Sequence, residues 1–266
     1  MKNTIIGAII GDVVGSTYEW NNCKSVDIDL FNPESTFTDD TVLTVAVADW
    51  LLNGGNLADI VHEYGNKYFD RGYGGRFIEW LCNDDKTAYN SFGNGSAMRV
   101  SPVGFAAATL EEALELAKQS AEITHNHPYG IIGAQAVAAA IFMAKTGKSK
   151  EEIKNYISRT FEYDLDFKLE DIRDDYKFDV TCSGSVPQAI VAFLESTDFE
   201  SALRLAISIG GDSDTICAIC SSISVSFFNT IPDEILNFVI SKLPIEFIEL
   251  LDEFDEKFYS NYFNCK

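Results

Sequence analysis

Two short acidic clusters lie far apart in this chain of 266 residues, and their side chains suit a single metal site. The first is Phe37-Thr38-Asp39-Asp40-Thr41, and the second is Gly210-Gly211-Asp212-Ser213-Asp214-Thr215. Neither contains His or Cys, so the ligands would be carboxylate and hydroxyl oxygens, which suit Mg²⁺, Mn²⁺ or Ca²⁺ and not Zn²⁺. If the fold brings the clusters together, their carboxylates repel one another severely unless cations lie between them.

Helix capping is the simpler interpretation of each cluster. Thr38 can cap the helix that follows it, with the acids complementing the helix dipole, and the second cluster permits the same arrangement. However, two acids in each cluster exceed what a cap needs, and the pair Gly210-Gly211 allows another group to approach the backbone closely. We therefore expect the two clusters to form one metal site at helix ends.

Four other glycine- or histidine-bearing loops are candidates for the walls of such a site. The segment 11–19 is either a helix end with solvated acids or a loop that carries Glu19 as a mobile carboxylate over the metals. The turn within 89–99 opens a helix, so its amide groups form either an anion site or a plain tight turn. The segment 124–128 holds two of the three His residues, as caps or as a wall beside a nucleotide. The segment 182–187 predicts an N-cap and nothing more.

Composition limits the classes of partner. Hydrophobic residues make up 46% of the chain, which is enough for one sizeable core. The net charge of −21 repels nucleic acid and anionic membranes, so we expect no direct binding to either. Asp12 interrupts the first apolar run too early for a signal peptide. The longest apolar stretch, 129–144, contains Gln135 and is short for a membrane span, which predicts a buried core helix.

The six cysteines show no spacing typical of a disulfide framework. Free thiols in a reducing cytoplasm are therefore the expectation. Cys217 and Cys220 form a CxxC motif, which is compatible with a redox or zinc pair. It lies in an apolar helical pattern with no second pair of Cys or His to complete a zinc site, so we predict buried structural thiols.

Helical periodicity dominates the chain between the loops. It predicts helices at 4–14, 40–52, 57–69, 75–82, 96–104, 110–123, 128–145, 150–160, 186–196, 199–209, 213–228, 232–243 and 245–260. One short extended piece is expected at 176–181, and no alternation of strands and helices indicates a parallel sheet. We expect an all-α protein, a single compact multi-helix domain over residues 1–266, acting as a monomer.

The motifs, taken in order, resemble the ADP-ribosylglycohydrolase family, which includes the dinitrogenase reductase-activating glycohydrolase. The shared segments are Gly11-Asp12 with Glu19, Phe37 to Thr41, Gly74 to Phe77 with Trp80-Leu81, Gly93 to Arg99 with Ser101-Pro102, Thr124 to Pro128, Gly184 to Ala189 and Gly210 to Thr215. The resemblance runs from about residue 4 to residue 228. Motifs in this order are far more specific than any one of them.

The resemblance implies hydrolysis of the glycosidic bond between the distal ribose of ADP-ribose and an acceptor, with two divalent cations, Mg²⁺ or Mn²⁺. The implied metal ligands are Thr38, Asp39, Asp40, Asp212, Asp214 and Thr215. Glu19 would be a flap carboxylate that contacts the metals or the substrate. Gly93, Asn94, Gly95 and Ser96 would hold the pyrophosphate, His125 would line the ADP-ribose cleft, and Gly184 and Ser185 would flank it.

The residues fit this chemistry. Glycosidic cleavage passes through an oxocarbenium-like state that carboxylates normally assist. A metal pair that binds the ribose hydroxyls would orient C1 and acidify a water molecule. Glu19, Asp39 and Asp212 are the candidates for the general acid or base, and the sequence does not choose among them. The substrate would be an ADP-ribosylated protein or small molecule, with the acceptor open.

Two other functions fit the same motifs. One is a two-metal phosphoesterase or pyrophosphatase acting on nucleotides related to ADP-ribose. The other is a non-catalytic ADP-ribose binder with structural metals, although neither acidic cluster has lost an acid.

The chain departs from the family after the second cluster, where small Gly or Ala positions are usual and 217–222 reads Cys-Ala-Ile-Cys-Ser-Ser. This departure predicts slightly different helix packing.

Overall fold

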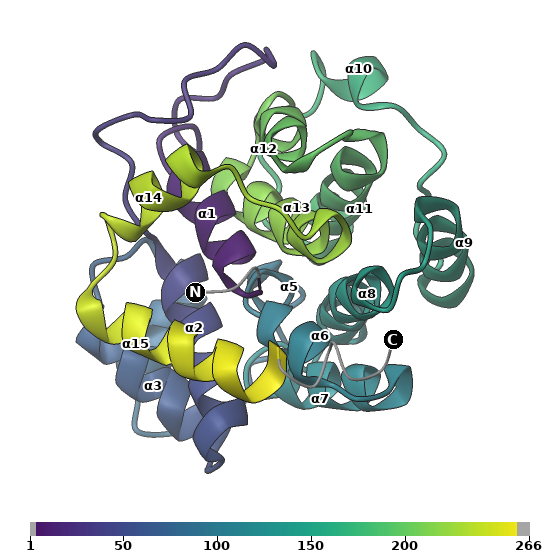
Figure 1. Cartoon of the computed structure of the whole chain (residues 1–266). Helices are drawn as coiled ribbons and strands as arrows, with labels where there is room; N and C mark the ends of the chain where they lie inside the picture. The colour runs from purple at the N-terminus through teal and green to yellow at the C-terminus, as the bar shows by residue number, and fades with distance from the viewer. Residues whose placement is uncertain (1–3, 260–266) are drawn as a thin grey trace.

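Helix α13, Ser213–Phe228, lies at the centre of the fold (Figure 1). It is buried from Ser213 to Ser226 because its sequence is apolar or small and carries no charge after Asp214. Helices α1, α8, α11 and α12 pack directly against it. This computed structural model describes residues 4–259.

Within these residues the secondary structure is helical. The helices are α1 (Ile6–Gly15), α2 (Asp39–Asn53), α3 (Leu57–Lys67), α4 (Gly75–Leu81), α5 (Gly95–Met98), α6 (Ser101–Ala106), α7 (Leu110–Glu122), α8 (Pro128–Lys145), α9 (Lys150–Phe161), α10 (Leu169–Ile172), α11 (Cys182–Glu195), α12 (Phe199–Ile207), α13 (Ser213–Phe228), α14 (Asp233–Ile240) and α15 (Ile245–Phe254), followed by a π-helical turn (Asp255–Tyr259). The predicted all-α class is confirmed. That residues 1–266 form one domain stays a prediction, because the two ends lie outside the described residues.

Most predicted helices are present, and α8 and α13 have the predicted bounds. The prediction of one helix at 96–104 was wrong, because α5 and α6 are separated at Arg99 and Val100. Pro102 has no N–H to continue the α5 hydrogen-bond ladder, so a new helix starts beside it. The short helix α10 was not predicted. Helix α15 ends at Phe254 and the π-helical turn continues to Tyr259, while the predicted end at residue 260 lies outside the described residues.

Of two expectations near residue 181, the helix start was wrong. The segment 176–181 has no helix, and in the described structure it contributes one isolated antiparallel bridge, between Thr181 and Gly93. Helix α11 begins at Cys182, not at residue 186, because Thr181 caps it by accepting a hydrogen bond from the Gly184 amide at 3.0 Å. Pro187 therefore lies inside the helix.

A stripe of glycines on α1 lets that helix touch the backbone of α13. Gly7, Gly11 and Gly15 recur every four residues, so they share one face. A Cβ atom on Gly11 would come within 2.3 Å of the Cys217 carbonyl oxygen, and one on Gly15 within 2.6 Å of the Asp214 Cα. The close approach brings the C-terminal end of α1 beside the acidic start of α13.

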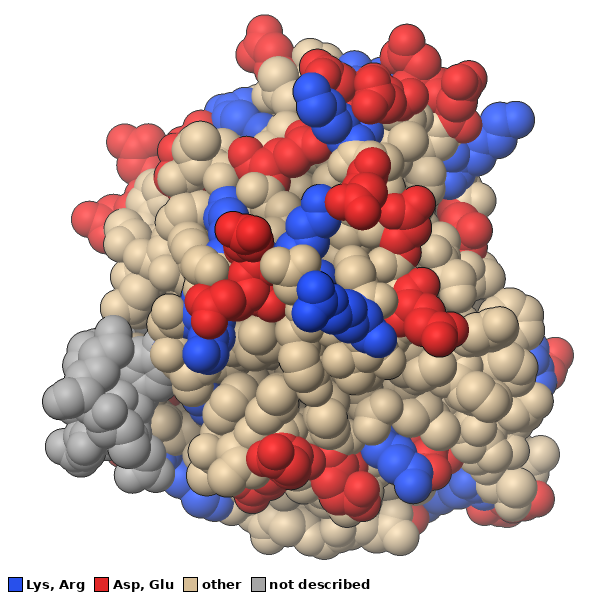
Figure 2. Space-filling view, turned by 90° about the vertical axis from the view of Figure 1, so that its right-hand side faces the viewer, with Lys and Arg blue, Asp and Glu red and all other residues tan. Residues whose placement is uncertain are grey.

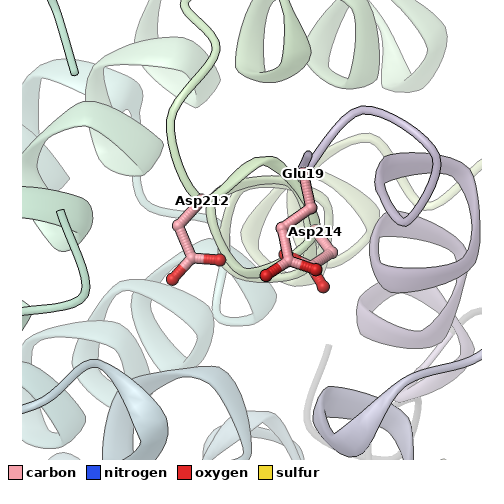
Figure 3. A group of neighbouring side chains, drawn as sticks. All are labelled: Glu19, Asp212 and Asp214. Atoms are coloured by element: carbon pink, nitrogen blue, oxygen red, sulfur yellow. The ribbon is translucent and has the colours of Figure 1, made fainter. Parts of the chain in front are cut away.

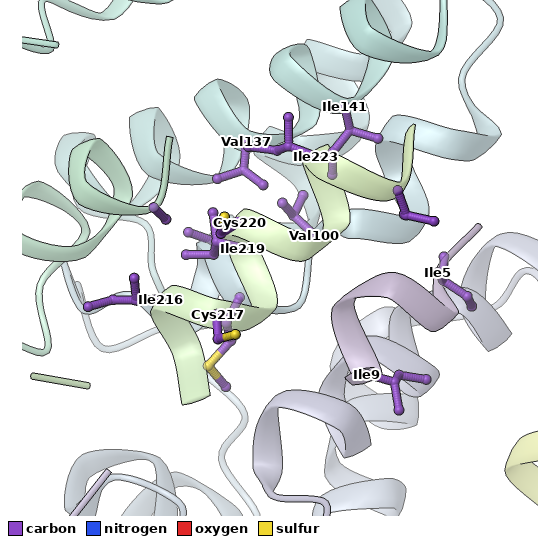
Figure 4. Packing of buried hydrophobic residues seen from close by; sticks show 14 of the residues in the cluster. Ile5, Ile9, Val100, Val137, Ile141, Ile216, Cys217, Ile219, Cys220 and Ile223 are labelled. Atoms are coloured by element: carbon purple, nitrogen blue, oxygen red, sulfur yellow. The ribbon is translucent and has the colours of Figure 1, made fainter. Parts of the chain in front are cut away.

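Residues 217–222, where the sequence departs from the family pattern, lie at this contact between α1 and α13. The Ser221 hydroxyl donates to the Cys217 carbonyl at 2.6 Å and lies where a Cβ atom on Gly11 would fall. Figure 4 shows Cys217 and Cys220 among the apolar side chains of the core. Both are buried free thiols, as predicted.

Helix α8 is, by length and composition alone, the one described helix apolar enough to cross a membrane. It contacts α13, α7 and α6, and 61% of this 18-residue helix is buried inside the protein. Figure 4 shows its Val137 and Ile141 beside Ile223 of α13. It packs as a core helix, in agreement with the prediction from its length.

We expect Gly11→Ala to destabilise the protein by about 2 kcal/mol, lowering Tm by roughly 4–8 °C, because the added carbon must push α1 away from rigid backbone. Gly75→Ala is the matched control, since nothing lies within 4 Å of its Cβ position and it is helical. Thermal unfolding of both variants measures the difference. Equal melting temperatures would contradict the close helix contact.

Candidate active site

The two acidic clusters meet at the N-termini of α2 and α13. The Thr215 hydroxyl donates to Asp40 Oδ2 at 3.1 Å, and the Thr38 hydroxyl lies 3.5 Å from Asp214 Oδ2. Asp40, Asp212, Asp214 and Thr215 are all buried. Residues separated by about 175 positions therefore share one polar centre.

Capping accounts for only part of this arrangement. Thr38 does cap α2, accepting a hydrogen bond from the Asp40 amide at 3.4 Å. Asp212, at the corresponding position of α13, makes no side-chain capping bond. Its Oδ2 instead accepts a hydrogen bond at 2.7 Å from the side-chain amide of Asn94, which belongs to a different loop. The second cluster is therefore turned toward the site.

Asp12 is the functional residue that sequence analysis missed. The alternative of a solvated acid is wrong for it, because Asp12 lies inside α1 and is fully buried. Its carboxylate accepts hydrogen bonds from the amide of Thr38 at 2.9 Å, from the hydroxyl of Thr38 at 2.7 Å, and from the amide and hydroxyl of Thr41. Asp12 thus fastens the first acidic cluster to α1 and orients the Thr38 hydroxyl.

Glu19 completes the acidic centre. One carboxylate oxygen from each of Glu19, Asp212 and Asp214 lies within 4.8 Å of the other two, a spacing that can hold a metal ion (Figure 3). Glu19 reaches Asp214 from the loop after α1, and both aspartates come from the start of α13. Glu19 is partly exposed, whereas the aspartates are buried.

Burial and mutual repulsion raise the pKa of every carboxyl group in this centre. Burial, with Asp214 and Asp12 nearby, raises the pKa of Glu19 to about 8. Burial raises the pKa of Asp212 to about 6, and it raises the pKa values of Asp39, Asp40 and Asp214 well above the ordinary aspartate value. The ionised forms of these groups are therefore costly side by side, and a cation bound among them would offset that cost.

The donors fit hard divalent cations. Asp40 Oδ1 is buried and has no hydrogen-bond partner, an arrangement that normally costs free energy. A cation at this oxygen would remove the cost. The surrounding donors are the carboxylates of Asp39, Asp212 and Asp214 and the hydroxyls of Thr38 and Thr215, all oxygen, which favours Mg²⁺ or Mn²⁺ over Zn²⁺.

The turn Gly93–Gly95 and His125 face each other across the neighbouring part of the site. Arg99 is fully buried and donates from Nη2 to the Thr124 hydroxyl at 3.0 Å, and that hydroxyl lies 2.7 Å from His125 Nδ1. Because the hydroxyl accepts from Arg99, it can donate its own hydrogen to Nδ1, and the neutral ring then carries its hydrogen on Nε2. Burial and the charge of Arg99 lower the pKa of His125 well below its usual value, so the ring stays neutral. Nε2 of His125 faces the turn.

A cleft of about 430 Å³ joins these parts. Its walls include Glu19, Asp39, Asp40, Gly93, Asn94, Gly95, His125, Asp212, Asp214 and Thr215 from the predicted site. No site role was predicted for the other residues in the walls, among them Trp20, Tyr73, Tyr89, Arg99 and Phe178. Arg99 ends the glycine turn motif, which was the available signal.

Three predicted substrate-binding residues lie behind the walls. The Ser96 hydroxyl donates to the Gly130 carbonyl at 2.7 Å, away from the cleft. Ser185 accepts from the Asn94 amide at 3.0 Å, so it supports the residue that holds Asp212. Gly184 leaves room for Asp179, whose carboxylate would lie 2.1 Å from an added Cβ. Their direct contact with substrate stays a prediction.

The raised carboxyl pKa values predict how stability depends on pH. The folded pKa of Glu19 is about 8 and its ordinary value is 4.5, so the folded protein takes up protons between these values while the unfolded chain does not. Stability without metal should therefore rise as pH falls from 8 toward 4.5. We expect Tm in chelator to be higher at pH 6 than at pH 8, with saturating Mg²⁺ reducing this difference.

Thermal unfolding at both pH values measures it. Asp214→Asn should reduce the difference in chelator, because it removes one of the repelling charges. Glu34→Gln, at an exposed position, is the control and should leave the difference unchanged. A parent protein that is less stable at pH 6 would contradict the burial of these acids.

Comparison with known proteins agrees with the fold and the site. The profile of the ADP-ribosylglycohydrolase family matches residues 1–243. The mouse (Mus musculus) protein named ADP-ribosylhydrolase ARH3 is 25% identical, with 85% of this chain and 83% of the mouse protein aligned. An uncharacterized protein of Archaeoglobus fulgidus is 27% identical over 97% of this chain and 95% of its own.

A bacterial relative and one solved structure extend the comparison. The protein named ADP-ribosylarginine hydrolase Tri1 from Pseudomonas putida is 23% identical over 93% of this chain and 73% of its own length. A structure titled ADP-ribosylglycohydrolase-related protein complex shares the fold, with a TM-score of 0.74 at 21% identity and 95% of each chain covered. The chain therefore belongs to the ADP-ribosylglycohydrolase family, enzymes that hydrolyse ADP-ribose linkages.

Proposed function

We propose that this enzyme binds two divalent cations, Mg²⁺ or Mn²⁺, between the two acidic clusters and releases ADP-ribose from a modified acceptor. The observation that carries the proposal is the set of converging carboxylates, in which Asp40 Oδ1 is buried without a partner. The proposed ligands are Thr38, Asp39, Asp40, Asp212, Asp214 and Thr215. When bound, the cations supply positive charge and Lewis acidity at the ribose hydroxyls.

The side chains around the cleft divide the remaining tasks. Glu19 is the proposed general acid or base, because it is partly exposed, unlike Asp212 and Asp214 beside it, and is carried by a loop. Its raised pKa allows it to hold a proton near neutral pH in the absence of metal. Asp39 and Asp212 are the other candidates for this role. Asn94 positions Asp212 through its amide.

We place the pyrophosphate of ADP-ribose at the turn Gly93–Ser96. Asn94 and Gly95 open the short helix α5 there, and Nε2 of His125 faces the turn from the opposite side. With its hydrogen on Nε2, the neutral ring would donate a hydrogen bond to the anion. Ser185 and Gly184 support this wall from behind.

We propose a modified protein or small molecule as substrate, since the relatives are named for ADP-ribosyl removal, in one case from arginine. On the face shown in Figure 2, Lys and Arg side chains are interspersed with acidic ones, which argues against nucleic acid as the partner.

The described cysteines are free thiols, which supports a cytoplasmic enzyme. We propose that it acts as a monomer.

A panel of arginine- and serine-linked ADP-ribosylated peptides, read by mass spectrometry and chromatography, tests the reaction. We expect intact ADP-ribose as product, with activity lost in excess chelator and restored by Mg²⁺ or Mn²⁺ rather than Zn²⁺. Asp39→Asn and Asp214→Asn should abolish turnover, because each removes a proposed ligand. Full activity in chelator would contradict the metal requirement.

The product separates the alternatives. AMP formed from free ADP-ribose would indicate a phosphoesterase or pyrophosphatase. Binding of ADP-ribose without turnover on any substrate of the panel would indicate a non-catalytic binder. Either outcome would contradict the proposed glycosidic cleavage.

Glu19→Gln separates catalysis from binding. The change removes a proton-transfer group and nearly keeps its size, so turnover should fall by roughly 10²–10⁴-fold. Calorimetry should show ADP-ribose binding within about tenfold of the parent, or ~1.4 kcal/mol, because the glycine turn and the other carboxylates remain. Near-parental turnover would exclude Glu19 and leave Asp39 and Asp212 as the acid or base.

A further inference from the structure

We infer that Asn22 is a positioning residue for Glu19. Its side-chain amide fastens the loop that carries Glu19 to Gly211, in the turn that presents Asp212 and Asp214. The inference rests on the proposed role of Glu19, and it adds the contact that holds this carboxylate over the acidic centre.

The Asn22 side chain accepts one hydrogen bond, and the two hydrogens of its Nδ2 are shared among three carbonyl oxygens. Asn22 Oδ1 accepts from the Gly211 amide at 2.7 Å, and Nδ2 lies 3.0 Å from the Gly211 carbonyl oxygen. Nδ2 also lies 2.8 Å from the carbonyl of Tyr18 and 2.7 Å from that of Glu19. Asn22 therefore pairs with both backbone groups of Gly211, as a neighbouring strand would, while holding the backbone of Glu19.

The Gly210-Gly211 pair is shaped for this contact. Both residues have positive φ, +66° and +80°, which favours glycine. A Cβ atom on Gly210 would lie 2.9 Å from Asn22 Oδ1, and one on Gly211 would lie 2.4 Å from the Tyr176 ring. The close approach that the two glycines allow is thus made, in this structure, by the chain's own Asn22 and Tyr176.

Two further contacts hold the same loop from either side of Asn22. The Lys24 ammonium donates to the carbonyl oxygens of Ile209 at 2.5 Å and Tyr176 at 2.7 Å. The Trp20 ring stacks on Phe178 with ring centres 5.2 Å apart, although Trp20 is 81% exposed. Asn22 is the one of the three that bonds the backbone of Glu19 itself.

The contact of Asn22 with Gly211 and the backbone of Glu19, called the latch below, lies at the surface. Asn22 is exposed, so water competes for each of its bonds, and breaking them does not require α1 or α13 to unfold. A single substitution can therefore remove the latch and leave the helices in place.

Asn22→Ala tests the latch, and Asn21→Ala is the matched control. Asn21 is the adjacent exposed asparagine and makes no side-chain hydrogen bond in the described structure. Hydrogen exchange followed by mass spectrometry, on metal-free protein, reports the loop directly. We expect peptides that cover residues 16–30 and 208–213 to exchange roughly fivefold faster or more in Asn22→Ala, with Asn21→Ala unchanged.

Kinetics of the metal-loaded enzyme give the second readout. Asn22→Ala should lower kcat about tenfold while KM and ADP-ribose affinity stay within roughly twofold, because Glu19 is misplaced for proton transfer and the nucleotide wall is intact. Asn22→Asp keeps the acceptor for the Gly211 amide but loses every donated bond, so it should resemble Asn22→Ala.

The two readouts separate the possible failures. Unchanged exchange in Asn22→Ala would overturn the latch, whatever the enzyme does. Faster exchange with parental kcat would overturn the positioning role. A parent protein with no hydrolase activity would contradict the proposed function and also the positioning role, while the exchange experiment would still report whether Asn22 holds the loop.

Discussion

The structure depends on placing several carboxylates beside one another in a buried centre. Neighbouring carboxylates repel one another strongly where water is excluded. Burial by itself also disfavours the ionised form of each carboxyl group. The protein offsets part of this cost with hydrogen bonds. Asp12 receives four of them from Thr38 and Thr41, Asp212 receives one from Asn94, and Asp214 receives one from the Thr215 amide. Asp40 Oδ1 receives none, and a cation is the group that would stabilise it.

A backbone contact between α1 and α13 sets the spacing of the acidic residues in this centre. Glycines on α1 bring that helix into contact with the backbone of α13, which places Asp12 and Asp214 close together. Asp12 then binds the N-terminus of α2 and brings the first acidic cluster to the second. Side chains can relax by rotation, whereas rigid helices in contact cannot, so helix packing fixes the spacing of Asp12 and Asp214.

Much of this could be predicted from the sequence. Apolar periodicity predicted α8 and α13 with their observed bounds, and the two acidic clusters were expected to meet. Helix boundaries that depend on a single proline or cap were less predictable, as at Pro102 and Thr181. Asp12 was missed because an acid beside a glycine is usually solvated, and its partners lie 26 and 29 residues away.

The cleft walls were the least predictable part. Arg99 contacts Ser120 and Thr124, and Asn22 contacts Gly211, so each acts through residues far along the chain that no local pattern indicates. Ser96, Gly184 and Ser185 stand in the right motifs but face neighbouring helices and loops, because a motif records which residues are near a site and not which way each side chain points. The double glycine at 210–211 signalled a close approach without naming Asn22 and Tyr176 as the groups that approach.

The most direct test of this account is a crystal structure of the protein with Mn²⁺, read by anomalous scattering. The account predicts two anomalous peaks in the cleft, at oxygen-ligand distances of roughly 2.0–2.3 Å from the carboxylates of Asp39, Asp40, Asp212 and Asp214. One of the peaks should lie at Asp40 Oδ1. A well-ordered cleft without an anomalous peak at saturating Mn²⁺ would contradict the claim that these buried acids are a cation site.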